Sequence, residues 1–347
     1  MMNKIAIFSD LHLGIKQDDE RWHNIALTWC DSFVSELKNR NIKEIIFLGD
    51  FFHTRNTISV NTLHVANLFL EKLKDFKLHM ILGNHDLYFH NESTVSGVNL
   101  FKNKNNIIVY DKLTKTRLGN KEVVFCGWGY DALSENANIL FTHAEINVFK
   151  FNAELGACNT GYKASELLNN YDLVYSGHFH LRQSKIWSKG RIIYPGNPYS
   201  MDHSDFYGSI KGFDVLNLDT MEIEVVENKI SPQFLRLSLS DICSDYYVIP
   251  ELANQIRGNI FKLIVDKNIT HKDLNILANL IDSASPFEFS YEWAVGADSA
   301  AKENTSSLEY FDFVDLIKEY IKLLDIENKD KVEEYILTLY NKVKAVN

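Results

Sequence analysis

The sequence lacks the features of a secreted, membrane-spanning or disulfide-built protein. Its four cysteines, Cys30, Cys126, Cys158 and Cys243, lie far apart and form no CxxC pair, which disfavours a disulfide framework and a thiolate zinc site. No apolar run approaches the roughly 18 residues that a membrane-spanning helix needs. The apolar run at residues 5–8 is too short for the core of a signal peptide. We therefore expect a reduced, cytoplasmic protein.

The net charge gives little support for a nucleic-acid partner, because phosphate binding relies on Lys and Arg and the net charge is −10. The charges are unevenly distributed, however. Residues 102–121 carry six basic side chains and one acid, and residues 181–191 carry four basic side chains and no acid. Residues 303–334 hold ten acids and four bases, a net −6. Each basic stretch is either a solvated face or a phosphate contact, so DNA stays open as a partner.

Apolar periodicity predicts strands that alternate with helices in the first part of the chain. Residues 4–8, 44–48 and 77–82 read as buried strands. Between them, apolar residues at three- and four-residue spacing predict a helix from about Trp22 to Leu37 and a second one with Ser59 as its N-cap. This order implies parallel strands with crossover helices. The pattern is mainly β from about residue 105.

Changes in pattern divide the chain into four parts. We expect a catalytic α/β domain at residues 1–230 and a small α+β unit at residues 231–295. Residues 296–307 are small and polar, which is typical of a flexible linker. Residues 308–347 carry two apolar stripes at helical spacing, which predicts a helical pair. This pair packs either on the chain's own catalytic domain or on a partner.

Side chains that can bind metals follow five of the predicted strands. They are Asp10, His12, Asp50, His53, Asn84, His85, Asp86, His143, His178 and His180. In open α/β sheets the carboxyl ends of the strands line the ligand crevice, so these side chains can converge although they are scattered in sequence. Taken alone, a pair such as His178 and His180 could equally be two ordinary loop residues.

Oxygen and nitrogen donors without cysteine suggest two manganese, iron or zinc ions. Two such ions, roughly 3.5–4 Å apart, bind a phosphate between them, activate a water and stabilise the attacking and leaving oxygens. A glycine precedes Asp50, Asn84 and His178, where we expect it to let the chain turn sharply and the phosphate approach the backbone. The pattern indicates phosphoester hydrolysis.

The segments DLH, GDFF, GNHD, TH and GHFH, in this order, resemble the signature of the calcineurin-like metallophosphoesterases over about the first 200 residues. The resemblance implies a layered α-β-β-α sandwich. It also implies that one ion binds Asp10, His12, Asp50 and His180, and that the other binds Asp50, Asn84, His143 and His178. Asp50 would bridge the two ions.

Within that family, the sequence is similar to the DNA-repair nucleases: the SbcD subunit of bacterial SbcCD and its tailed-phage recombination counterparts. The segments GDFFH and RIIYPGNPYS carry this similarity, although Asn197 stands where the family usually has Ser. The similarity implies a manganese-dependent 3′-to-5′ exonuclease and single-strand endonuclease, in the host cytoplasm if a phage encodes it. It implies that residues 231–295 cap the DNA and that residues 308–347 bind an SbcC-type coiled-coil ABC ATPase. A homodimer is compatible with it.

Three residues are candidates for catalysis besides the ligands. His85 can donate a proton to the leaving oxygen, and Asp86 is expected to orient the His85 ring. His53 is expected to contact the phosphate or the leaving group. We also expect DNA contacts from Arg55, Tyr88, Arg182 and Lys185, through phosphates for the cations and through stacking for the tyrosine.

Two other functions fit the sequence. One is a stand-alone phosphodiesterase or phosphatase that acts on a small molecule, a nucleotide or a phosphoprotein. The other is a scaffold subunit that binds DNA and the ATPase through an inert site. The complete ligand set argues against the scaffold, because inert sites usually lose ligands.

Overall fold

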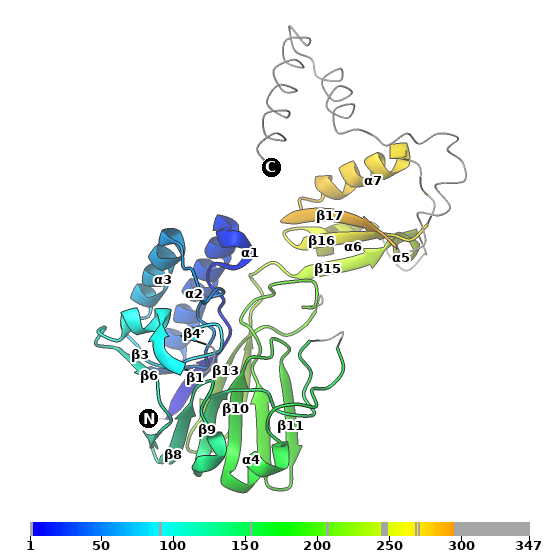
Figure 1. The fold of residues 1–347 in the computed structure, drawn as a ribbon. Helices are drawn as coiled ribbons and strands as arrows, with labels where there is room; N and C mark the ends of the chain where they lie inside the picture. The colour runs from blue at the N-terminus through cyan, green and yellow to red at the C-terminus, as the bar shows by residue number, and fades with distance from the viewer. Residues whose placement is uncertain are drawn as a thin grey trace.

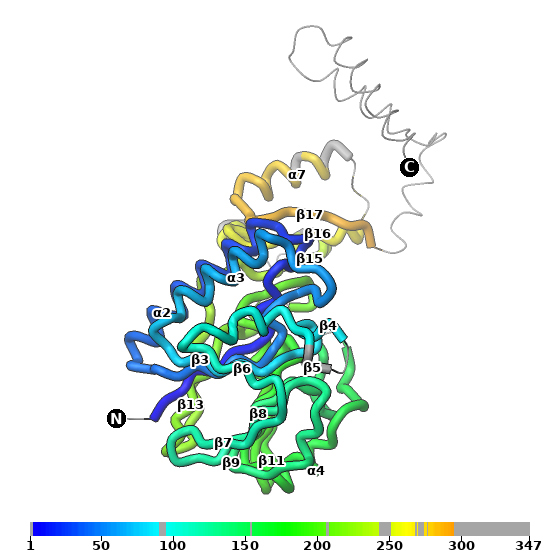
Figure 2. The backbone as a smooth tube through the Cα atoms, turned by 60° about the vertical axis from the view of Figure 1, so that its left-hand side comes forward, coloured from blue at the N-terminus to red at the C-terminus, as the bar shows by residue number. Residues whose placement is uncertain are grey.

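Two six-stranded sheets pack face to face and carry helices on their outer faces (Figure 1 and Figure 2). The structure, a computed structural model, describes residues 3–89, 92–152, 155–205, 208–243, 249–267, 269 and 271–294. The predicted linker at residues 296–307 and the predicted helical pair at 308–347 lie outside the described residues, so both stay predictions.

The first sheet contains the three strands predicted near the N-terminus. Its order is β14 (Ile223–Glu227), β13 (Gly212–Asn217), β1 (Lys4–Phe8), β2 (Glu44–Phe47), β3 (Lys77–Ile81) and β6 (Ile107–Tyr110). Strands β1, β2, β3 and β6 are parallel, whereas β13 is antiparallel to both of its neighbours. The residues that follow β1, β2 and β3 therefore meet at one edge of the sheet.

The second sheet is parallel except at its two edge strands. Its order is β11 (Gln183–Trp187), β12 (Gly190–Tyr194), β10 (Tyr171–Gly177), β9 (Ala137–His143), β8 (Lys121–Cys126) and β7 (Thr114–Leu118). The edge strands β7 and β11 are antiparallel to their neighbours. Gly177 pairs with His143 across β10 and β9, so the carboxyl ends of these two strands lie level with each other.

Helices α2 (Glu20–Asn39) and α3 (Val60–Lys72) cover the outer face of the first sheet (Figure 2). Aromatic side chains fill the space beneath them: the Phe8 and Trp29 rings lie 5.2 Å apart, and the Trp29 and Phe33 rings 5.0 Å apart. The Ser59 side chain accepts a hydrogen bond from the Thr62 N–H and caps α3, which confirms the predicted N-cap.

Helix α4 (Ala164–Asn170) covers the outer face of the second sheet. A separate apolar core lies between the two sheets and contains Ile7, Ile46, Phe125 and Phe141. Because strands such as β1 send alternate side chains to opposite faces, each sheet contributes to two cores. The layers are helix, sheet, sheet and helix, which confirms the expected α-β-β-α sandwich.

A third sheet of three parallel strands follows β14 and forms a small unit (Figure 1). Its elements are β15 (Phe234–Ser238), α5 (Leu239–Cys243), α6 (Ile249–Ile256), β16 (Ile260–Val265), α7 (His271–Ser283) and β17 (Glu288–Trp293). The unit contacts the start of α2, where Trp22 stacks on Phe234 with the ring centres 6.1 Å apart and Arg21 pairs with Glu288 at 3.3 Å.

Several short elements connect the strands. They are α1 (Ile15–Asp18), the hairpin of β4 (Leu87–Phe89) and β5 (Glu92–Ser96), and two 3₁₀ helices at Gly97–Phe101 and Ala132–Ser134. Within α1, Lys16 and Gln17 have left-handed backbone angles, so this element is a distorted turn. Among the described residues, we find no helix with the length and apolar character to cross a membrane.

Candidate metal centre

Asp10, His12 and His180 form the first group of donors. Their donor atoms lie within 4.8 Å of one another. The Nε2 atoms of His12 and His180 are 3.0 Å apart. Burial lowers the pKa of His12 well below its ordinary value, which favours the neutral imidazole. Two ring nitrogens at this distance either share a proton or face the same cation.

Asp50, His143 and His178 form a second group whose donor atoms also lie within 4.8 Å of one another. Asn84 completes it, because its Oδ1 lies 3.0 Å from both the Nε2 of His143 and the Nδ1 of His178. Burial lowers the pKa of His178 to about 3, and the neighbouring His143 contributes to this shift. The group therefore presents two oxygens and two imidazoles to one point.

The carboxylate of Asp50 faces both groups. Its Oδ2 lies 3.6 Å from the Nε2 of His12 and 3.4 Å from the Nε2 of His143. Its Oδ1 accepts a hydrogen bond of 2.8 Å from the backbone N–H of His85. Burial alone would raise the pKa of Asp50, but His143 and His12 hold it well below its usual range. Asp50 is thus ionised and lies between the two groups.

His143 is held in one orientation by the first sheet. Its Nδ1 donates to the carbonyl of Leu48 at 2.7 Å, because a carbonyl oxygen can only accept. This bond leaves the Nε2 to face Asp50 and Asn84. Burial would lower the pKa of His143, but Asp50 raises it to about 9. The two sheets therefore meet at the donors, since His143 belongs to β9 and Leu48 follows β2.

The backbone at the site is strained. Asp10, His12, Asp50 and His178 have φ values of 56°, 47°, 59° and 90°, in the left-handed region that side chains other than glycine rarely adopt. Hydrogen bonds help to hold the backbone in this conformation, for example the one from the Asp10 N–H to the Gly49 carbonyl at 3.0 Å. A functional site is a common place for such strain.

At Gly83, close packing within the protein and not a left-handed turn accounts for the glycine, while the approach of a phosphate stays a prediction. A Cβ added at Gly83 would lie 2.2 Å from the Oδ1 of Asp50 and 2.5 Å from the backbone nitrogen of Asp50. The glycine is required here because two segments of the protein itself pass so close together. Only Gly49, at φ 94°, combines this close approach with a left-handed turn among the three glycines.

His85 and His53 lie beside the first donor group. Donor atoms of His12, His53 and His85 fall within 4.8 Å of one another, and the His12 and His85 ring centres are 4.9 Å apart. The Nδ1 of His85 donates to the carbonyl of His53 at 2.6 Å. This bond fixes the ring, so the Nε2 is the His85 nitrogen left for chemistry.

Asp86 corrects an expectation, because its carboxylate does not orient the His85 ring. Its Oδ2 accepts from the backbone N–H groups of Asp50 and Gly83, and its Oδ1 accepts from those of Phe51 and Phe52. These four bonds measure 2.9–3.2 Å, and Asp86 is buried. The side chain therefore ties the segment after β2 to the segment after β3, and the His53 carbonyl orients His85.

The four residues that we expect to contact DNA differ in their burial and in their partners within the protein. Arg182 forms an ion pair with the buried Asp214 through its Nη1, so part of its guanidinium is engaged within the protein, and a DNA contact from it stays a prediction. Lys185 is exposed on β11, where its Nζ donates to the Val148 carbonyl. Tyr88 is 50% exposed in the β4–β5 hairpin, and Arg55 is partly buried after β2.

A buried ion pair supports the loop that carries His180. The Nζ of Lys211 donates to the His180 carbonyl at 3.0 Å, to the Asn197 amide oxygen and to the Asp205 carboxylate. Asp205 also accepts from the Nδ2 of Asn197 at 3.1 Å and from the Met201 N–H at 2.8 Å. Asn197, to which the sequence assigned no role, therefore completes this network.

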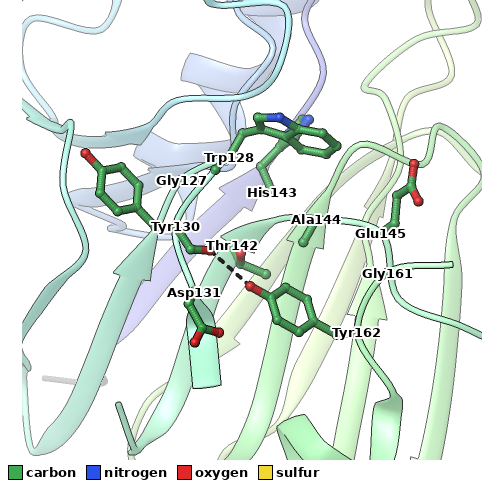
Figure 3. A pocket seen from close by; sticks show the side chains of 11 residues that line it. Gly127, Trp128, Tyr130, Asp131, Thr142, His143, Ala144, Glu145, Gly161 and Tyr162 are labelled. Carbon is green, nitrogen blue, oxygen red and sulfur yellow. Dashed lines mark hydrogen bonds between the residues drawn. The ribbon is translucent and has the colours of Figure 1, made fainter. Parts of the chain in front are cut away.

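Two residues near the donors were missed by the sequence analysis. Trp128 packs on His178, with the ring centres 5.0 Å apart, and Figure 3 shows it next to His143. The Oε1 of Glu145 lies 3.5 Å from the Nε2 of His178. A signal for Trp128 was available, because the segment GWG directly follows β8, as the donors follow their strands.

These donors and this sandwich are those of a metal-dependent phosphoesterase. A model of the calcineurin-like phosphoesterase family matches residues 3–182, and the chain belongs to this family. Described residues of both sheets supply the candidate ligand groups.

One curated relative is exonuclease subunit 1 of Enterobacteria phage T4, which is 28% identical over 237 residues. The match covers 65% of this chain and 68% of that protein. It supports the nuclease branch of the family.

Among solved structures, the chain matches a dimetal phosphatase from Danio rerio, with 12% identity and a TM-score of 0.42 over 62% of this chain and 93% of that chain. A candidate 5′-nucleotidase from Staphylococcus aureus has 13% identity and a TM-score of 0.40 over 65% of this chain. The second match spans 52% of that longer chain.

Proposed function

We propose that this protein is a metal-dependent DNA nuclease that hydrolyses phosphodiester bonds with two Mn²⁺ ions. The observation that carries the proposal is the position of Asp50, whose Oδ2 lies 3.6 Å from the Nε2 of His12 and 3.4 Å from the Nε2 of His143. A carboxylate oxygen between two groups of donors is what a ligand shared by two ions requires. The proposed activities are 3′-to-5′ exonuclease and single-strand endonuclease.

The donor chemistry fits two divalent ions. The proposed first set is Asp10, His12, Asp50 and His180, and the proposed second set is Asp50, Asn84, His143 and His178. All are oxygen or imidazole donors, a mixture that suits manganese, iron or zinc. Manganese is proposed among these on the similarity to the DNA-repair nucleases. None of the described cysteines belongs to the donor groups, and burial raises the pKa of Cys126 to about 12.

When bound, two such ions orient the phosphate, activate a water and stabilise the charge that develops on the attacking and leaving oxygens. The chain's own histidines then act on the leaving group. With its Nδ1 proton held by the His53 carbonyl, His85 in its imidazolium form can donate the Nε2 proton to the leaving oxygen and return to the neutral ring. The His53 ring lies parallel to it at 5.9 Å, where it can contact a phosphate oxygen.

DNA as the substrate is supported by the similarity to a phage exonuclease subunit. The name of that relative also supports a complex, and we propose an SbcC-type coiled-coil ATPase as the partner. In this scheme, residues 231–295 cap the DNA, and residues 308–347 bind the ATPase. The complex would act in DNA repair and recombination.

One assay of the purified protein tests the activity. With Mn²⁺ we expect cleavage of single- and double-stranded DNA, and we expect EDTA or Asp50→Ala to abolish it, because removing the shared carboxylate leaves two cations repelling each other. Asp75→Ala, an exposed carboxylate, is the matched control and should cleave normally. Cleavage of a small phosphodiester but not of DNA would favour a stand-alone phosphodiesterase. Bound ions without any hydrolysis would favour the scaffold.

A truncated chain tests the partner. We expect a chain that ends at Ser299 to cleave DNA with Mn²⁺ but no longer to co-purify with the ATPase. The double change Ile336→Asp and Leu339→Asp should cause the same defect in the full chain, because it places charges on the predicted apolar stripe. A truncated protein that still forms the complex on size exclusion, or that aggregates, would contradict a dedicated partner segment.

A further inference from the structure

A cavity of about 470 Å³ opens beside the second donor group (Figure 3). Its walls come from the loop after β8, from the end of β9 and from Gly161 and Tyr162. His143, one of the proposed ligands, is part of the lining. The cavity therefore borders the second donor group.

Trp128 lines the cavity next to the donors. Its ring centre lies 5.0 Å from that of His178 and 6.1 Å from that of His143. Its backbone N–H donates to the Leu82 carbonyl at 2.8 Å, which fixes the loop to the end of β3. An indole held beside the donors offers a stacking surface next to the site.

Gly161 and Tyr162 form the opposite wall (Figure 3). The Tyr162 hydroxyl donates to the Tyr130 carbonyl and accepts from the Ala132 N–H, both at 3.0 Å, which holds the phenol ring in place (Figure 3). Gly161 has φ 76°, and a Cβ there would lie 2.1 Å from the Glu145 carbonyl oxygen. No other residue fits at this position without moving the wall.

The charges of the cavity indicate what it can hold. Asp131 and Glu145 are part of its lining, and Glu145 accepts from the Thr160 hydroxyl at 2.6 Å. Two carboxylates disfavour a phosphate, so the DNA backbone does not belong in this space. An uncharged heteroaromatic ring fits both the aromatic walls and the volume, which lies within the roughly 300–1,000 Å³ of small-ligand sites.

We propose that this cavity receives the nucleobase of a nucleotide adjoining the scissile phosphate. The inference rests on the proposed nuclease function and names the feature of DNA that the site would recognise. A base can enter only after it leaves the helical stack, so the cavity selects single-stranded DNA or a frayed end. Trp128 then stacks on the base while the donors hold its phosphate.

The test measures cleavage at individual linkages. The full-length protein with Mn²⁺ is given a single-stranded oligonucleotide with one abasic nucleotide, and the same oligonucleotide with all bases present. We expect cleavage to slow at one of the two linkages that flank the abasic site, on the order of 10- to 100-fold, the change that losing one aromatic–base stack produces. Wild-type cleavage at an unchanged rate on both sides would overturn the inference and leave the nuclease function standing. No cleavage of either DNA would instead refute the nuclease function.

Two tryptophan variants locate the effect. In Trp128→Ala, the ratio of the cleavage rate of the intact oligonucleotide to that of the abasic one should fall toward one. Because both rates are measured with the same variant, a change at the metal centre affects both of them. Trp187→Ala, a tryptophan on β11 outside the cavity, should keep the wild-type ratio. An unchanged ratio in Trp128→Ala would contradict stacking on this side chain. The wild-type comparison remains decisive if that variant loses its ions.

Discussion

Replacing Asp86 with asparagine should destabilise the folded site, and we expect no direct effect on proton transfer by His85. Each oxygen of Asp86 accepts two backbone N–H groups, from Asp50 and Gly83 on one side and from Phe51 and Phe52 on the other. Asparagine keeps one acceptor oxygen and turns its NH₂ group toward the other two donors. Two buried N–H groups therefore lose their acceptor.

The size of the effect follows from those two donors. A buried donor without a partner costs about 1–3 kcal/mol, so Asp86→Asn should lower the free energy of unfolding by about 2–6 kcal/mol. This is a large fraction of the roughly 5–15 kcal/mol by which folded proteins are typically stable. Because at least one of the two lost bonds comes from the segment of Asp50, Phe51 and Phe52, the shared carboxylate should shift and metal content should fall as well.

Urea unfolding followed by tryptophan fluorescence, together with elemental analysis, measures both quantities. Asp75→Asn removes the same charge at an exposed position and should change stability by less than about 0.5 kcal/mol. The reasoning would be refuted if Asp86→Asn unfolded at the wild-type urea concentration and kept both ions but hydrolysed DNA slowly. That result would mean that Asp86 acts through His85 after all.

Three further predictions concern the site and its support. His85→Gln should keep both ions yet lose about 10²–10⁴-fold in rate, the usual contribution of a general acid or base, and a parallel loss of metal would make His85 a ligand. Against the effect of burial, neighbouring carboxylates raise the pKa of His143 to about 9, so Mn²⁺ binding near neutral pH should release a proton and tighten as pH rises toward 9. Calorimetry in buffers of different ionisation enthalpy measures that release, and its absence would contradict the raised pKa. Lys211→Met should cost about 3–5 kcal/mol in urea unfolding because it leaves Asp205 buried without its partner, whereas the exposed Lys189→Met should change little.

Much of the fold could be predicted because its central strands are buried on both faces. Such strands read as continuous apolar runs, and β1, β2 and β3 appear where the sequence placed them. The edge strands β7 and β11 were not predicted, because most of their residues are polar and exposed or only partly buried, and they form no continuous apolar run. Helix α4 was missed because its seven residues are too few for a clear helical period.

The donors of the candidate site could be found because each lies at or just after the carboxyl end of a strand, and parallel strands end at one edge of a sheet. The partners of individual side chains could not. Arg182 and Asp214 are 32 residues apart in sequence, and only the folded chain brings them together. Asp86 sits beside His85 in sequence, yet its carboxylate points to the backbone of another loop. Adjacency in sequence therefore predicted the wrong contact.

The donors that converge on Asp50 come from both sheets, so bound metal would affect the lifetime of the protein in a cell. Bound ions would link the two sheets of the sandwich. Because ions that bind the folded state stabilise it by mass action, the stability of the packing between the sheets would depend on metal supply. A chain without bound metal would lose its activity, and at the same time its two sheets would separate more readily. Proteases that attack transiently opened chains would remove inactive copies first, so metal occupancy would set the lifetime of the protein as well as its catalysis.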